Sequence, residues 1–284
     1  MMKQQFISIK GLSLCFCEWG ERENPTIIIL HGWLDQAAAW SRVAEGLLEK
    51  GYHIIALEHR GHGLSEHLPD YCDYHFPDYI ADVQELVRQL ALKNFVLIGH
   101  SMGGTISCIY TALCPVKPRR LVLIDGVGTR HENEEKAALR YTTHLEQRRR
   151  PARHRIMDTR KVAREKLRYN HPYLSEQWAE ELVFRITKSV GEGWSWTWDP
   201  RHKNRSAVGF HLPRFLELLG QITAPTTLIF GGNDWYAKLA DLPARIKAFP
   251  APPQEIILPT SHSPHLENPS LLIRAILVGL EGEA

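Results

Sequence analysis

A chain of 284 residues, of which 44% are hydrophobic and 23% are charged, has the composition of a globular protein and is long enough to bury one large core. Its 34 Lys and Arg residues nearly balance its 32 Asp and Glu residues, and the formal net charge of +2 excludes the strong overall field that attracts nucleic acid. We therefore expect no nucleic-acid partner.

The chain also lacks the signals of a membrane or secreted protein. No window approaches ~18 uncharged apolar residues, and residues 1–10 contain no apolar segment of signal-peptide length. The five cysteines are odd in number and lack paired spacing, which predicts free thiols and no zinc site. The expectation is a cytoplasmic protein without a membrane span and without a bound metal.

Short apolar runs alternate with helical patterns along most of the chain. The predicted strands are residues 6–9, 12–17, 26–30, 53–57, 95–99, 121–125, 226–232 and 254–259, and the predicted helices are 37–50, 78–92, 102–114, 243–249 and 269–280. Parallel strands that are buried on both faces are uniformly apolar. The alternation therefore predicts an α/β fold with a mostly parallel, eight-stranded sheet flanked by helices.

Residues 129–213 interrupt this alternation with charged helical stretches and no apolar strand. Because the later strands need the earlier ones to bury both faces, we predict one core formed by 1–128 and 214–284, with 129–213 inserted after the sixth strand as a helical cap. Residues 130–171 hold 13 Lys or Arg against 6 Asp or Glu. This basic stretch is either a solvated helical face or a surface for an acidic partner, such as an acyl carrier protein.

The segment "IGHSMGGT" (98–105) places Ser101 between Gly99 and Gly103, where a predicted strand ends and a predicted helix begins. A tight strand-to-helix turn strains its central residue, and flanking glycines avoid collisions with neighbouring backbone. The serine is then exposed beside a helix N-terminus, whose free N–H groups stabilise developing negative charge. A serine hydroxyl attacks only when a base removes its proton, so this pattern predicts a nucleophile with an imidazole nearby.

Further candidate residues follow the ends of other predicted strands. The segment "HGW" (31–33) follows the third strand, "GGND" (231–234) the seventh and "SHSPH" (261–265) the eighth. Ligands of open parallel sheets bind beyond the carboxyl ends of the strands, so we expect these loops to meet. The candidate serine, aspartate and histidine follow one another along the chain in that order, which is one of the orders in which the residues of catalytic triads occur.

These segments resemble α/β-hydrolases that carry a cap, in the esterase-like branch with the pimeloyl-ACP methyl ester esterases and serine hydrolase-like proteins. The matching segments are "ILHGWLDQAAAW" (29–40), "EHRGHGLS" (58–65), "LIGHSMGGTIS" (97–107), "LIFGGNDW" (228–235) and "SHSPHLENP" (261–269). The resemblance spans both halves of the core and implies the α/β-hydrolase fold. The family usually has Asp where this chain has Glu58.

The resemblance also implies roles for individual residues. Ser101 would be the nucleophile and His262 the base; Asp234 would be the acid, with Asp125 at the end of the sixth strand as the alternative. The backbone N–H groups of Trp33 and Met102 would form the oxyanion hole. The residues expected to line the substrate pocket are His31, Gly32, His100, Trp194, Trp196 and Trp235.

The predicted function is hydrolysis of a carboxylic ester of a small or medium acyl substrate through an acyl-enzyme, with no cofactor. The alternatives are a methyl ester presented by an acyl carrier protein at the basic cap, or cleavage of a carbon–carbon, lactone or amide bond by the same triad. A binding protein that has lost turnover is a further alternative. A fold alone names no substrate.

Overall fold

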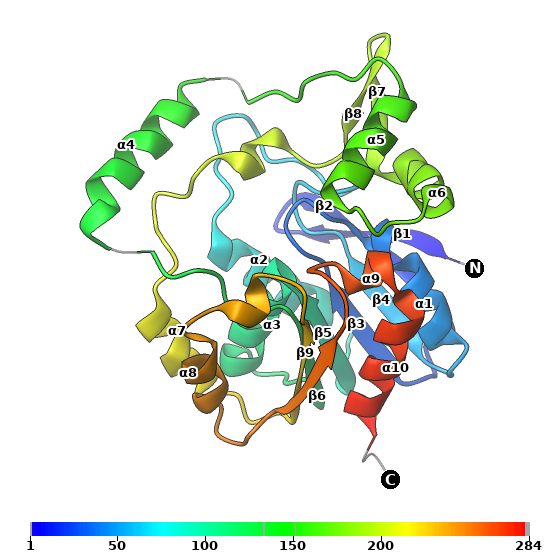
Figure 1. The fold of residues 1–284 in the computed structure, drawn as a ribbon, viewed down its shortest axis with the longest axis vertical. Helices are drawn as coiled ribbons and strands as arrows, with labels where there is room; N and C mark the ends of the chain where they lie inside the picture. Colours follow the sequence, from blue (N-terminus) through cyan, green and yellow to red (C-terminus); the bar gives the residue numbers. More distant parts are fainter. Residues whose placement is uncertain (1, 133, 151, 282–284) are drawn as a thin grey trace.

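The structure is a computed structural model that describes residues 2–132, 134–150 and 152–281; Asn133 and Pro151 of the predicted cap lie outside the described residues. Its centre is an eight-stranded sheet with helices on both faces (Figure 1), as the sequence predicts. The strands, given in sheet order, are β1 (Lys3–Ile9), β2 (Leu12–Trp19), β4 (His53–Leu57), β3 (Thr26–Leu30), β5 (Phe95–His100), β6 (Arg120–Ile124), β9 (Thr226–Gly231) and β10 (Gln254–Leu258).

Most strands of this sheet are parallel. β2 is antiparallel to both of its neighbours, and every pair from β4 to β10 is parallel. Alternate residues of β3 reach opposite faces: Ile28 and Leu30 pack into one hydrophobic cluster, and Ile27 and Ile29 into another. This burial on both faces explains why the parallel strands read as continuous apolar runs in the sequence.

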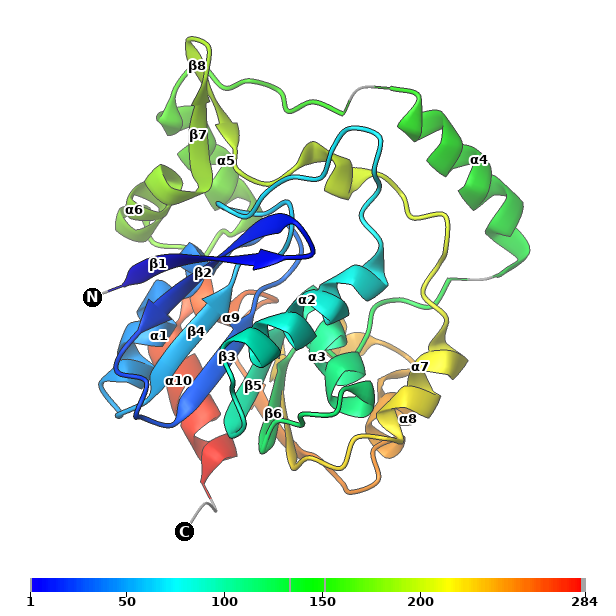
Figure 2. The same cartoon turned by 180° about the vertical axis from the view of Figure 1, so that it is seen from behind.

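Helices cover the two faces of the sheet. Residues of α2 (Phe76–Gln89), α3 (Met102–Leu113) and α7 (Leu212–Leu219) pack in the first cluster, and those of α1 (Ser41–Leu48) and α10 (Pro269–Leu280) in the second. Figure 2 shows α2 and α3 on the face opposite α1 and α10. This part also contains the short α-helices α8 (Leu242–Lys247) and α9 (Pro264–Glu267).

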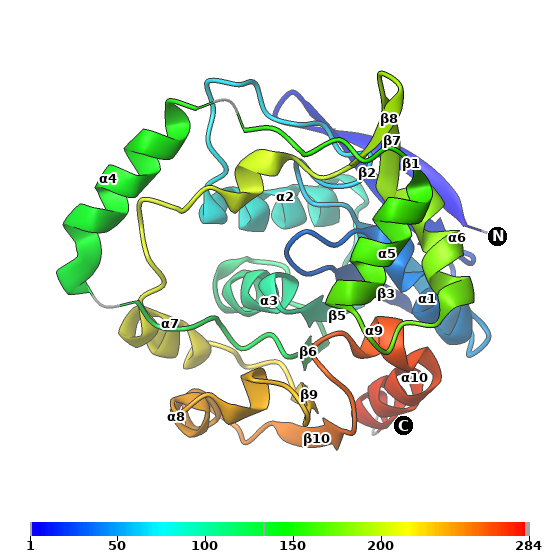
Figure 3. The ribbon, with the colours of Figure 1, turned by 45° about the horizontal axis from the view of Figure 1, so that its top comes forward.

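A helical insertion follows β6, as predicted. It contains α4 (Ala137–Arg148), α5 (Arg160–Asn170) and α6 (Glu176–Ile186). Leu167 of α5 and Leu182 of α6 join the second hydrophobic cluster together with Trp40, so this pair of helices packs on the core. α4 lies away from α5 and α6 (Figure 3).

The insertion also contains two short strands, although its sequence shows no apolar strand. β7 (Thr187–Val190) and β8 (Gly193–Trp196) form an antiparallel hairpin beside α6. β7 carries exposed polar residues such as Lys188, so it has little of the apolar character by which the other strands are predicted.

All five cysteines are free, as expected, and four of them are buried. None of the helices formed by the described residues combines the length and the apolar character that a membrane span requires.

Candidate active site

The chain turns sharply between β5 and α3, and Ser101 occupies the turn. Its φ of 52° and ψ of −113° lie in a region that non-glycine residues avoid, which is the strain expected of the central residue of such a turn. A Cβ on Gly103 would lie 2.1 Å from the carbonyl oxygen of Leu30, and one on Gly99 would lie 2.4 Å from Ser107 Oγ. Both glycines are therefore required for the turn to close against β3 and α3.

Ser101 and His262 are brought together from distant parts of the chain. His262 lies in the loop between β10 and α9, and its Nε2 is 3.0 Å from Ser101 Oγ. This distance lets the imidazole accept the hydroxyl proton. The structure thus brings these two side chains together.

Both candidate carboxylates reach the other nitrogen of the same ring. His262 Nδ1 lies 3.1 Å from Asp234 Oδ2 and 3.4 Å from Asp125 Oδ2. Asp125 is fully buried, and its carboxylate also accepts a hydrogen bond from the N–H of Gly231 at 3.1 Å. Burial raises the pKa of the Asp125 carboxyl, although His262 and the Gly231 N–H act in the opposite direction. Asp234 is the nearer of the two and the more exposed to solvent.

The segments that carry the predicted oxyanion-hole residues both lie next to the nucleophile. A Cβ on Gly32 would be 3.3 Å from Ser101 Cβ, so the loop that carries Trp33 lies against the serine. Met102 is the first residue of α3, where a backbone N–H has no partner within the helix. Neither the Trp33 N–H nor the Met102 N–H has an acceptor among the described residues. The arrangement can therefore offer two free donors to an oxygen bound at Ser101.

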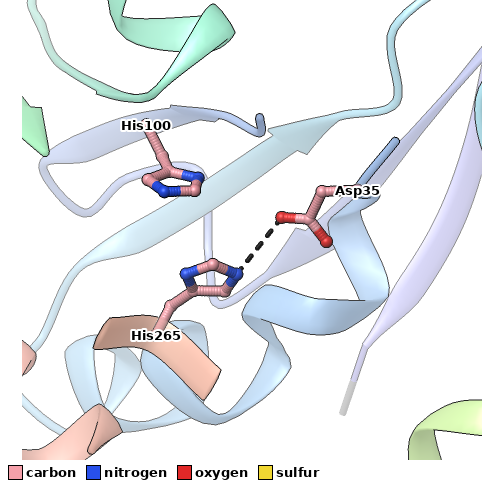
Figure 4. A group of neighbouring side chains, drawn as sticks. All are labelled: Asp35, His100 and His265. Atoms are coloured by element: carbon pink, nitrogen blue, oxygen red, sulfur yellow. Dashed lines mark ion pairs between the residues drawn. The ribbon is translucent and has the colours of Figure 1, made fainter. Parts of the chain in front are cut away.

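A second group of side chains, Asp35, His100 and His265, lies next to this site (Figure 4). His265 Nε2 is 3.2 Å from Asp35 Oδ2, and the Trp40 indole donates to the same oxygen at 3.1 Å. The His265 ring stacks on Trp40 with centroids 4.3 Å apart. His100 Nε2 lies 2.7 Å from the carbonyl oxygen of His262. These contacts join the loop of Trp33 to the loop of His262.

The pKa of Asp35 reflects this pairing. Burial acts to raise the pKa of its carboxyl, but the hydrogen bond and charge of His265 outweigh burial and hold it below its ordinary value. Sequence reasoning gave Asp35 no role, although the residue lies within the matching segment 29–40.

Two groups of side chains could each offer three ligand atoms to a metal: Asp35, His100 and His265, and Asp125, Asp234 and His262. We assign neither group a metal, since its members already pair with one another or with Ser101.

A cavity of about 1090 Å³ opens beside Ser101 and His262, at the junction of the core and the insertion. Of the residues predicted to line the pocket, Gly32, His100 and Trp196 do so, and Trp198 also contributes. Such a volume is at the upper end of the range for small-molecule sites.

Three of the predicted pocket residues do not line this cavity. His31 is buried behind it, where its Nε2 accepts a hydrogen bond from the N–H of His59 at 3.1 Å. Trp194 packs under the guanidinium of Arg160, 3.7 Å from its ring centroid, because β8 directs it toward α5. The Trp235 ring lies 5.8 Å from that of His262, outside the cavity wall.

Known proteins resemble this chain in sequence and in fold. Residues 25–269 match the model of the alpha/beta hydrolase fold family. A serine hydrolase-like protein from Dictyostelium discoideum is 29% identical over 94% of this chain and 78% of its own length. One from Danio rerio is 32% identical over 79% of this chain and 70% of its own length. A thioesterase domain from the curacin biosynthetic pathway superimposes with a TM-score of 0.88 and 29% identity, over 98% of this chain and 99% of that domain.

The chain belongs to the α/β hydrolase fold family. Within that family it is a serine hydrolase, related to the serine hydrolase-like proteins.

Proposed function

We propose that this protein hydrolyses carboxylic esters through an acyl-enzyme formed on Ser101. The observation that supports the proposal best is the 3.0 Å contact between Ser101 Oγ and His262 Nε2, at the end of a cavity large enough for an acyl substrate. Ser101 attacks the ester carbonyl while His262 takes its proton, and the alcohol leaves with that proton. Water activated by His262 then releases the acid and restores the serine.

The surrounding residues have separate roles in this proposal. Asp234 holds the Nδ1 proton of His262 in place and stabilises the imidazolium that forms during attack, and Asp125 is the alternative acid. The N–H groups of Trp33 and Met102 stabilise the oxyanion of the tetrahedral intermediate. No step needs a cofactor.

We also propose that 1–128 and 214–284 form the catalytic core and that 129–213 form a cap over it.

A thioester is the second candidate substrate, because the chain superimposes on a thioesterase domain over nearly its whole length. The chemical steps are the same, with a thiol in place of the alcohol as the leaving group. Recognition of an acyl carrier protein by Arg148, Arg149 and Arg150 has less support. Arg148 already pairs with Asp73 at 3.0 Å, as a solvated helix that makes surface ion pairs would do.

The test is turnover of short p-nitrophenyl esters, together with labelling by a fluorophosphonate probe that modifies activated serines. Native protein should be active and labelled, and Ser101→Ala should be neither. Ser189→Ala is the matched control, because Ser189 is an exposed serine on β7, away from His262, and its loss should change nothing. Equal activity in Ser101→Ala and native protein contradicts the proposal, and so does a native protein that resists the probe.

A further inference from the structure

The insertion contributes positive charge to the cavity that holds Ser101. Arg153, Arg155, Lys166 and Lys203 all line it, and three of them are exposed to solvent while Lys166 is half-buried. Among the residues that the structure describes, none of the four has a carboxylate within ion-pair distance. Lys203 instead lies over the ring of Trp198, 4.9 Å from its centroid. These cations are therefore unneutralised by the protein.

Few acidic side chains line the cavity to balance these four cations. The acidic residues that line the cavity are Asp35 and Glu165. Asp35 pairs with His265 on the core side, which leaves Glu165 as the acid on the side of the insertion. A cavity lined mainly by charges of one sign attracts a ligand of the opposite sign, and its low-dielectric walls strengthen that attraction.

Apolar side chains also line the cavity. Leu167, Leu182 and Leu266 are buried side chains that line it, and Trp196 and Trp198 add aromatic surface. On the core side the cavity reaches Ser101, His262 and Gly32. The cavity thus presents three regions: the reacting groups, an apolar wall, and a cationic rim.

From this arrangement we propose that the substrate is an amphiphilic acyl compound that carries an anionic group, which binds at the rim formed by Arg153, Arg155, Lys166 and Lys203. Its apolar chain lies against Leu167 and its neighbours, and its ester or thioester carbonyl reaches Ser101. The proposal rests on the proposed function and names the substrate class for the same site. The anion has two chemical sources: a carboxylate at the far end of the acyl chain, or a phosphate on the leaving group.

Binding to Ser101→Ala tests the proposal without turnover. Dissociation constants are measured by calorimetry for two matched pairs: monomethyl suberate against methyl octanoate, and S-octanoyl-4′-phosphopantetheine against S-octanoylpantetheine. At least one anionic compound should bind about tenfold more tightly than its neutral partner, since several exposed ion pairs each contribute a few-fold. That preference should fall at high ionic strength. The pair that shows it identifies the source of the anion.

Charge reversal then locates the preference. Lys166→Glu combined with Lys203→Glu should abolish it and leave binding of the neutral partner nearly unchanged. Lys161→Glu is the matched control, because Lys161 is an exposed residue of the same helix that does not line the cavity. Equal affinities within both pairs overturn the proposal, as does a preference that survives the double charge reversal. The proposed function fails separately, if native protein hydrolyses none of the four compounds or the p-nitrophenyl esters.

Discussion

Two carboxylates lie within reach of the His262 imidazole, so mutagenesis can test which of them is the acid of the proposed triad. In an environment with an effective dielectric constant near 20, a carboxylate at 3.1 Å or at 3.4 Å stabilises an imidazolium by about 5 kcal/mol, so distance alone hardly separates Asp234 from Asp125. Their surroundings do separate them. Burial raises the pKa of the Asp125 carboxyl, which disfavours its charged form. The Asp125 carboxylate also accepts a hydrogen bond from the Gly231 N–H.

We therefore predict unequal effects of Asp234→Asn and Asp125→Asn. Loss of about 5 kcal/mol from the transition state corresponds to a loss of about 10³- to 10⁴-fold in kcat, which we expect for Asp234→Asn. Asp125→Asn leaves the nearer carboxylate in place and should cost about tenfold. The assay is steady-state hydrolysis of a p-nitrophenyl ester, with thermal unfolding measured to exclude misfolding. A larger loss in Asp125→Asn than in Asp234→Asn would exchange the two roles and refute this reasoning.

Three further predictions concern stability and positioning. Burial raises the pKa of Glu58 to about 7, above its unfolded value, so folding binds an extra proton and stability falls as pH rises from about 4.5 to 7. Glu58→Gln should remove about 3 kcal/mol of this pH-dependent change in the free energy of unfolding, measured by denaturant unfolding at a series of pH values. A variant whose free energy of unfolding depends on pH as in the native protein would contradict the argument. Asp35→Asn leaves the buried His265 without its carboxylate partner and should cost about 3 kcal/mol of stability and about tenfold in kcat. Trp40→Phe replaces the indole with a smaller phenyl ring and removes the N–H donor to Asp35, and it should cost less in kcat than Asp35→Asn. Gly103→Ala places a Cβ against Leu30 and should lower the melting temperature by several degrees at least, and a variant that melts with the native protein would show that the turn can relax.

Much of the core could be predicted because its strands obey a single physical rule. A strand buried on both faces, such as β3, has no polar positions, so its residues form an apolar run that stands out from the helices around it. The elbow at Ser101 could be predicted because its backbone conformation and close contacts demand glycine nearby. His262 and the two candidate acids could be predicted because each follows the end of a strand.

Other features depend on contacts that a one-dimensional pattern does not contain. The pairing of Asp35 with His265 joins residues far apart in the chain, and neither side chain has an unusual local context. The β7–β8 hairpin has few apolar residues on its first strand, so periodicity does not reveal it. Trp194 and Trp196 are two residues apart on β8 and so share one face of the strand, yet only Trp196 lines the cavity, because Arg160 of α5 covers the Trp194 ring.

The position of the insertion has a consequence for how this protein can change. β6 and β9 pair directly, with Leu121 opposite Thr226, so the polypeptide leaves the sheet from one strand and re-enters it at the neighbouring strand. Every group to which we assign a part in bond cleavage comes from the scaffold on either side of that junction. The intervening segment can therefore be exchanged or redesigned as a module: a new one would alter which molecules are admitted while the cleavage apparatus stays intact.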